Sequence, residues 1–389
     1  MLSLPDPTNP NPSIKGRVGR FWHRVTEGLE VNQLWSQIQK DARSSYRLYS
    51  ADLGDLGKET SRFRRGRTIA RALFWAILEK LTPARRVLLL LALLLLFLPA
   101  FSSNNNHAEI SEFDLHVWGG LLLLVVLLLE LADRVVMKRD LEIAKDIQAW
   151  LLPGAPLQIP GYQIAYATRP ANTVAGDYYD VILRTASASG APSNDPNDGR
   201  ILFVVADVAG KSIPAAMLMA TFQASLRTLS SSGIPLVELV AGVNRYACSN
   251  SQGGVRFTTA FFAELDPATG AVSYVNAGHN VPILRRRSGI IERLEAGGLP
   301  VGIFPEAGYQ LGSARLDPGD WLVIFTDGVV EAVNAKDEEF GEPNLIRLVD
   351  AQSDNAPAEL LRSLLADLDR HVGNAPQHDD ITCLLLKRS

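Results

Sequence analysis

Cysteine is almost absent from this chain of 389 residues. The two copies, Cys248 and Cys383, lie far apart, and no other cysteine or histidine stands at the spacing of a zinc site. This argues against a disulfide-stabilised scaffold and a cysteine-based metal site, and it suits a reducing compartment. Any metal ion that the protein binds must therefore be held by carboxylates.

The chain also lacks an excess of positive charge, and its first residues do not predict a cleavable leader. Its formal net charge is -4, which gives no reason to expect a nucleic-acid partner. Residues 1–13 are polar and proline-rich, unlike a cleavable signal peptide, and no internal repeat is evident. A hydrophobic content of 47% is too high for a disordered chain, so we expect a full catalytic core with accessory segments.

Two runs, residues 87–101 and 115–129, contain no lysine, arginine, aspartate or glutamate. Buried helices of soluble proteins usually carry some polar residues, so a transmembrane hairpin is favoured over a buried soluble pair. About 15 residues rise only about 22 Å against a hydrocarbon core of roughly 30 Å, so the flanks must snorkel or the bilayer must thin.

Charges around the two runs predict their orientation. The loop 102–114 has acids but no lysine or arginine, whereas basic residues flank the outer ends of the pair: Arg85, Arg86, Arg134, Lys138 and Arg139. Since positive flanks stay on the cytoplasmic side, we predict a multi-pass protein of the cell inner membrane with both termini and the catalytic domain in the cytoplasm. The short loop favours anchoring over ligand sensing.

The segments on either side of the hairpin leave alternatives open. Residues 62–81 join an arginine cluster to an apolar stripe, which fits an interfacial helix on anionic lipid and equally a solvated basic helix. Residues 130–152 indicate one polar helix that ends at Pro153. Its apolar positions follow alternating steps of four and three residues, which fits a homodimer seam. Gln148 falls on that seam, so packing on the chain's own catalytic domain is the alternative; the seam comprises Met137, Leu141, Ala144, Gln148 and Leu151.

From residue 160 onward, short β runs alternate with turn residues and helices. The predicted strands are 162–168, 177–183, 200–208, 258–265, 271–277, 281–287, 320–326 and 381–387, and the predicted helices are 213–229, 234–248 and 357–371. Most connections have hairpin length, so we predict an α+β fold of two packed, mainly antiparallel sheets flanked by helices. Residues 185–199 fit a dispensable hairpin tip.

The predicted organisation has four parts. They are an N-terminal cytoplasmic helical region at 1–83, a two-helix transmembrane hairpin at 84–131, a linker helix at 132–155 and the catalytic domain at 156–389.

Four aspartates stand at the ends of predicted strands: Asp177, Asp207, Asp327 and Asp379. One such aspartate is usually a turn residue, but the repetition predicts that the four carboxylates converge. Carboxylates clustered without basic neighbours repel one another unless cations neutralise them, and divalent ions with oxygen ligands fit this need. Glycines beside the acids let the backbone approach a ligand closely, so a carbonyl can join the coordination; they are Gly176, Gly210 and Gly328.

Seven segments, in their order along the chain, resemble the SpoIIE-like, RsbU-type branch of the metal-dependent protein phosphatases, the protein phosphatase 2C superfamily. They are IQAWLLP, RPANTVAGDYYD, ADVAGKSIPAAM, NAGHNVPIL, AGGLPVGI, FTDGVVEA and HDDITCLLL. The resemblance implies hydrolysis of phosphoserine or phosphothreonine on a regulatory protein, such as an anti-sigma-factor antagonist, by a water activated between two manganese or magnesium ions. It also implies that the linker helix acts as a switch.

The resemblance further implies a role for each acid. Asp207 would bridge the two cations, the Val208 carbonyl would complete the second, and Asp327 and Asp379 would hold the first. Asp177 would act largely through metal-bound water, and Asp380 is the less certain member of its pair with Asp379.

The chain departs from the family pattern at several points. Ala209 stands where the eukaryotic branch has a histidine proposed as proton donor, the VAGD segment replaces a commoner double glycine, and GKS replaces a glycine before the helix. His279 is read as structural, and Arg169 as a solvated residue or a phosphate contact. A catalytically silent binding module and a two-metal nucleotide cyclase are the competing functions, and no substrate-binding residue is predicted.

Overall fold

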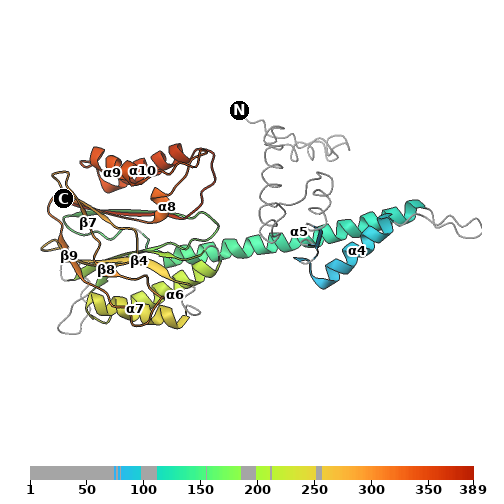
Figure 1. Cartoon of the computed structure of the whole chain (residues 1–389), viewed down its shortest axis with the longest axis horizontal. Coiled ribbons are helices and arrows are strands. Elements are labelled where there is room, and N and C mark those ends of the chain that lie inside the picture. The colour runs from blue at the N-terminus through green and yellow to red at the C-terminus, as the bar shows by residue number, and fades with distance from the viewer. Residues whose placement is uncertain are drawn as a thin grey trace, which may run out of the picture. The chain divides into compact units, whose positions relative to one another are not determined.

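The computed structural model describes residues 74–75, 78, 80–97, 112–154, 156–184, 199–210, 213–250 and 256–389 (Figure 1). The chain separates into two compact units, Met1–Ala132 and Asp133–Ser389. The predictions for residues 1–73, for most of the connecting loop and for the hairpin tip lie outside the described residues.

Two apolar helices pack together in the N-terminal unit. They are α4 (Pro83–Phe97) and the first part of α5 (Glu112–Leu151). A Cβ built on Gly119 would lie 3.0 Å from the carbonyl oxygen of Ala92, a fully buried residue. Arg85 pairs with Glu130 at 3.1 Å. The two contacts show that the helices run antiparallel, and the small residues let them approach closely.

The described helices differ in their capacity to span a membrane. One of them, Leu115–Leu151, is long and apolar enough to do so. Helix α4 has 15 residues, and at 1.5 Å per residue it is shorter than the hydrocarbon core. The antiparallel helix pair is therefore present, whereas the two-span, multi-pass arrangement stays a prediction.

The C-terminal unit contains the two predicted sheets. The first sheet has the order β1 (Tyr162–Arg169), β11 (Ile381–Arg388), β10 (Trp321–Phe325), β6 (Ile283–Arg285) and β7 (Ile291–Arg293). The second has the order β2 (Tyr178–Arg184), β3 (Arg200–Val208), β4 (Thr258–Leu265), β5 (Ala271–Ala277) and β8 (Gly297–Gly298), with β9 (Gly312–Arg315) also paired to β5. Among the ladders between the strands that the structure describes, the β5–β8 ladder is the only parallel one, and an isolated bridge between Ala260 and Gly278 is also parallel.

Helices cover the outer face of each sheet (Figure 1). The second sheet is covered by α6 (Ile213–Ser230) and α7 (Leu236–Asn250), and the first by α9 (Glu342–Ala351) and α10 (Pro357–Val372). Strand β3 shows why its sequence is apolar throughout. Phe203 and Val205 face the core between the sheets, whereas Leu202 and Val204 face the helices. The predicted α+β architecture is confirmed.

The sequence did not predict five short elements: β7, β8, β9, α9 and the single turn α8 (Asp327–Val330). Most are too short to show a period.

Part of the predicted linker seam packs on the chain's own catalytic domain, because Gln148 bonds to Ala175 and the Leu151 carbonyl accepts from Gln223. These contacts support the alternative that the C-terminal end of α5 packs on the chain's own catalytic domain.

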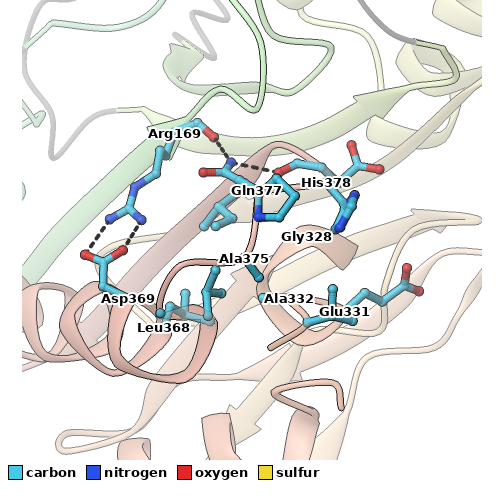
Figure 2. Close-up of a pocket in the computed structure, with 15 residues that line it drawn as sticks. Arg169, Gly328, Glu331, Ala332, Leu368, Asp369, Ala375, Gln377 and His378 are labelled. Carbon is cyan, nitrogen blue, oxygen red and sulfur yellow. Dashed lines mark hydrogen bonds and ion pairs between the residues drawn. The ribbon is translucent and has the colours of Figure 1, made fainter. Parts of the chain in front are cut away.

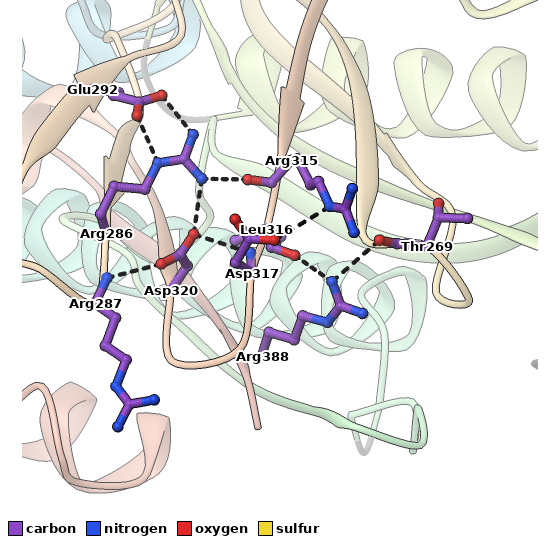
Figure 3. A network of polar contacts seen from close by, with 9 residues as sticks. All are labelled: Thr269, Arg286, Arg287, Glu292, Arg315, Leu316, Asp317, Asp320 and Arg388. Atoms are coloured by element: carbon purple, nitrogen blue, oxygen red, sulfur yellow. Dashed lines mark hydrogen bonds and ion pairs between the residues drawn. The ribbon is translucent and has the colours of Figure 1, made fainter.

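A network of charged residues lies at the start of β10 (Figure 3). Asp327 follows the other end of that strand. The buried Asp320 accepts hydrogen bonds from Arg286 Nη1 and from the Arg287 backbone N–H, both at 2.8 Å. Arg286 also pairs with Glu292 at 2.6 Å. Asp320 lies beside a buried strand, and Arg286 compensates its negative charge.

Candidate active site

The strand registers gather the four predicted aspartates in pairs. In the second sheet, Tyr178 lies opposite Ala206, so Asp177 before β2 and Asp207 near the end of β3 share one edge. In the first sheet, Phe325 lies opposite Cys383, and Asp327 after β10 shares an edge with Asp379 before β11. The expected convergence at strand ends is thus observed within each sheet.

Thr326 joins the two edges. Its Oγ1 donates a hydrogen bond of 2.9 Å to Asp177 Oδ2, although Thr326 lies in the first sheet's edge and Asp177 in the second's. Both side chains are buried, and Asp177 is 2% exposed. The sequence analysis did not single out Thr326, whose only signal is its position immediately before Asp327. The two sheets therefore meet at this hydrogen bond.

Asp380 secures the loop that precedes Asp177. Its Oδ1 accepts from the Ala171 N–H at 2.7 Å, and its Oδ2 accepts from the Gly176 N–H at 2.6 Å. The neighbouring Asp379 is half-buried and accepts from the Asp380 N–H at 3.0 Å. Both oxygens of Asp380 therefore serve the loop, which separates the role of Asp380 from the role predicted for Asp379.

Two of the noted glycines allow backbone segments to touch within the site. A Cβ on Gly328 would overlap the carbonyl oxygen of Asp380, and a Cβ on Gly176 would lie 3.1 Å from the Val208 carbonyl oxygen. Any larger residue at position 328 would push Asp327 away from Asp379 and Asp380. Gly210 has a φ of 115°, a conformation that favours glycine, in open surroundings.

Acidic side chains gather at this end of the two sheets. Burial, followed by repulsion from Asp207 and Asp380, raises the pKa of Asp177 well above its usual value, although hydrogen bonds from Thr382 and Thr326 oppose this. Burial also raises the pKa of Glu331, with further contributions from three acids: Asp327, Glu339 and Asp379. Both pKa shifts have neighbouring carboxylates among their causes, so the acids of the site lie close enough to repel one another.

The candidate side chains have the chemistry of a divalent-cation site, although the described structure does not bring three of them within coordinating distance of one ion. All the candidate side chains offer carboxylate oxygens, which Mg²⁺ and similar ions prefer. Across the part of the chain that the structure describes, no group of three or more Asp, Glu, His or Cys side chains is close enough together to hold a metal ion. The acids therefore form two neighbouring groups that a cation would have to draw together.

A pocket of about 250 Å³ adjoins Asp379 and Gly328 (Figure 2). Arg169 on its wall forms a two-pronged ion pair with Asp369, with nitrogen–oxygen distances of 2.5 and 3.3 Å. Gln377 Nε2 donates to the Arg169 carbonyl at 2.9 Å and to the Asp379 carbonyl at 2.8 Å. Arg169, considered from the sequence as a phosphate contact, is thus an ion-pair partner of α10.

His279 lies in a tight turn behind the site. The Asn276 side chain accepts from the His279 N–H at 2.7 Å and donates to its carbonyl at 3.1 Å. His279 Nδ1 lies 3.2 Å from Thr259 Oγ1, and Thr259 is the strand partner of Asp207. Burial lowers the pKa of His279 to about 4, so the ring is neutral near pH 7. These contacts support the structural interpretation of this residue.

Comparison with known proteins places this arrangement in a family. The family described as Stage II sporulation protein E (SpoIIE) matches residues 197–389. Protein IcfG of Synechocystis sp. is 30% identical over 281 residues, which cover 65% of this chain and 42% of IcfG. Phosphoserine phosphatase RsbU of Bacillus subtilis is 27% identical over 253 residues, which cover 65% of this chain and 71% of RsbU. The chain therefore spans less than half of the first of these relatives.

A solved structure shares the fold. The SiaA-PP2C domain of Pseudomonas aeruginosa superposes with a TM-score of 0.56 and 19% identity, covering 66% of this chain and 99% of that domain. Its likeness supports the two-sheet architecture independently of the sequence motifs. Motif order, fold and relatives agree, and the chain belongs to the SpoIIE-like branch of the metal-dependent protein phosphatases, the protein phosphatase 2C superfamily.

Proposed function

We propose that this protein is a metal-dependent serine/threonine protein phosphatase, anchored in the membrane, that hydrolyses phosphoserine or phosphothreonine on a regulatory protein. The observation that carries the proposal is the gathering of the aspartates at the strand ends of the two sheets, where burial and repulsion from Asp207 and Asp380 raise the pKa of Asp177.

The proposed ligands are those that the family pattern implies. Asp207 would bridge two manganese or magnesium ions, and Asp327 and Asp379 would hold one of them. The Val208 carbonyl would complete the other, and Asp177 would act largely through water. When bound, the ions would neutralise phosphoryl oxygens and lower the pKa of the attacking water.

The chain's own residues orient these ligands. Thr326 fixes one oxygen of Asp177, and Asp380 fixes the loop before it. Gly328 lets Asp327 lie against the Asp379–Asp380 backbone. Ala209 occupies the position of the histidine of the eukaryotic branch, so that position offers no group to protonate the leaving oxygen. Solvent would then supply that proton.

The activity of a relative supports the substrate class. RsbU is a phosphoserine phosphatase, and we extend that activity to this chain. The proposed substrate is a small phosphorylated regulator of the anti-sigma-factor antagonist type. The apolar part of α5, together with its partner α4, would anchor the enzyme at the membrane with the catalytic domain in the cytoplasm.

The competing function is a catalytically silent binding module. Such a protein has no need for the metal aspartates, whereas all four predicted positions here carry aspartate. Purified full-length protein in detergent should hydrolyse a phosphoserine peptide when manganese is added and stop when the metal is chelated. Binding of the peptide without turnover would favour the module, and conversion of a nucleoside triphosphate in place of peptide hydrolysis would favour a cyclase.

A further inference from the structure

The pocket beside Asp379 combines apolar walls with acidic side chains (Figure 2). Its volume is about 250 Å³, which leaves room for one long side chain from outside. The apolar part of its lining includes two buried residues and four partly exposed ones: Leu368, Ile381, Ala332, Val333, Val372 and Ala375. Figure 2 shows Glu331 on one side of these residues and Asp369 on the other.

These two acids differ in whether they already have a cationic partner. Asp369 holds the guanidinium of Arg169 through two contacts, at 2.5 and 3.3 Å. The exposed Glu331 side chain makes no hydrogen bond and no ion pair within the part of the chain that the structure describes, and its charged neighbours there are all acids. Glu331 is therefore the acid of the pocket that a new cation would meet.

A phosphoryl group does not suit this pocket. Arg169, the cation on its wall, is already paired with Asp369, and Glu331 would repel a phosphoryl anion. A long basic side chain suits it better, because arginine and lysine carry a cationic head on an apolar stem. The stem would pack on the apolar lining, and the head would pair with Glu331.

The pocket lies one helical turn away from a proposed metal ligand. The Glu331 N–H donates to the Asp327 carbonyl at 2.8 Å, where Glu331 ends α8. Four residues of helix rise about 6 Å, whereas an extended peptide advances about 3.3 Å per residue. A substrate side chain in the pocket would therefore belong to a residue about two positions from the phosphorylated one.

We propose that this pocket is a specificity subsite, which accepts an arginine or lysine side chain of the phosphorylated protein substrate and pairs its charge with Glu331. This rests on the proposed function, because it places the phosphoryl group at the neighbouring aspartates. Glu331 contacts the substrate away from the reacting atoms, so it selects the substrate and takes no part in the chemical step.

Hydrolysis of short phosphoserine peptides by the full-length protein in detergent tests the subsite. The peptides carry alanine around the phosphoserine, except for one arginine that is moved through the neighbouring positions on either side. Ion pairs at exposed sites are weak and partly enclosed ones are stronger, so we expect one arginine position to raise kcat/KM about three- to tenfold. The gain should appear as a lower KM, since the interaction is the same before and during the reaction.

Two variants remove the two parts of the subsite separately. Glu331→Gln removes the charge and should bring the ratio of kcat/KM for the arginine and alanine peptides close to one. Ala332→Leu keeps the charge but fills part of the apolar interior, and it should lower the same ratio by excluding the stem.

Glu359→Gln is the matched control. Glu359 is an exposed acid in the first turn of α10, whereas the pocket is lined by the last turns of that helix. This variant changes the net charge of the protein by the same amount, so it should keep the preference for arginine.

Several results would overturn the subsite. They are a wild-type enzyme without preference for a basic neighbour, a Glu331→Gln variant that keeps the preference, and a Glu359→Gln variant that loses as much of it. A Glu331→Gln variant that loses kcat/KM equally on all peptides, and regains it at higher manganese concentration, would assign Glu331 to a bound cation instead.

Failure of this proposal is distinct from failure of the proposed function. Wild-type protein that hydrolyses the alanine peptide with manganese, but gains nothing from arginine, contradicts only the subsite. Wild-type protein that hydrolyses none of the peptides with manganese contradicts the phosphatase itself.

Discussion

At the scale of single residues, the polar groups around the strand ends fall into two kinds. Asp320 and Asp380 accept several hydrogen bonds and are compensated by their partners. Asp177 receives a hydrogen bond from Thr326, but burial and the neighbouring carboxylates raise its pKa. The first kind stabilises the fold, whereas the second is the kind found at functional sites.

The two kinds should respond oppositely to loss of charge. Asp177→Asn relieves burial of a repelled carboxylate, so it should stabilise the metal-free protein by on the order of 1 kcal/mol at pH 7. Asp320→Asn removes the partner of a buried arginine contact and should cost about 3 kcal/mol. Thermal melting with a chelator present measures both.

The pH dependence supplies an internal check on Asp177. Its pKa in the folded protein lies above that in the unfolded chain. The protonated form is therefore stabilised by folding, and this stability is lost as the pH rises from about 4 through the folded pKa. The advantage of Asp177→Asn over wild type should thus grow with pH, and an advantage that shrinks with pH contradicts the repulsion.

His279 should show the opposite sign. Burial lowers its pKa from 6.5 to about 4, so the folded protein holds the neutral ring while the unfolded chain takes up a proton. Stability should fall as the pH drops from 6.5 toward 4. His279→Asn should flatten this slope in a melting series while keeping most of the manganese-dependent rate, and loss of nearly all turnover would instead point to a chemical role.

At the scale of elements, the site depends on short connections more than on the long strands. The turn α8 begins at Asp327, and its Gly328 lies against the carbonyl of Asp380. The loop 170–176 is fixed by Asp380 and Gln148. These segments set the distances between acids that the strands bring to one edge.

Gly328→Ala should therefore damage the site strongly. The added Cβ meets backbone that cannot rotate away, and overpacking of this kind costs about 1–3 kcal/mol. We expect a lower melting temperature and a loss of manganese affinity. Gly154→Ala, in open surroundings, is the control and should behave as wild type; a Gly328→Ala protein with normal metal affinity would contradict the close approach.

The long elements and the acids were accessible from the sequence, whereas their connections were not. Strand β3 has nine residues, most of them apolar, and Asp207 stands next to its last residue. Such an apolar run predicts both a buried strand and the position at which the strand ends. By contrast, the Thr326–Asp177 bond joins residues 149 positions apart, and no local pattern predicts such a pair. Gln148 was visible only as a polar residue on an apolar seam.

At the scale of the whole molecule, one chain combines a catalytic unit with an apolar N-terminal unit. The antiparallel pairing of α4 and α5, with Ala92 against Gly119, is what a helical hairpin in a bilayer requires. The helix α5 continues from that pair to Gln148. One continuous helix therefore joins the proposed membrane anchor to the catalytic domain.

Labelling of single cysteines tests the predicted topology. Asn105→Cys in the connecting loop should react with a membrane-impermeant maleimide in intact spheroplasts, whereas Ser389→Cys should react only after lysis. The background is low because Cys383 is buried, and Cys248 can be replaced by serine. Reaction of Asn105→Cys only after lysis would contradict the hairpin orientation.

The most direct test of the two-metal site is the rate of phosphoserine hydrolysis as a function of manganese concentration, in wild type, Asp207→Asn and Asp320→Asn. We predict saturable manganese dependence in wild type and a loss of more than about 100-fold in Asp207→Asn, with its fold retained. Asp320→Asn should melt earlier yet keep the same manganese dependence below its melting temperature. Wild-type protein without manganese-dependent hydrolysis, or Asp207→Asn with full rate, would contradict the assignment of these aspartates as metal ligands.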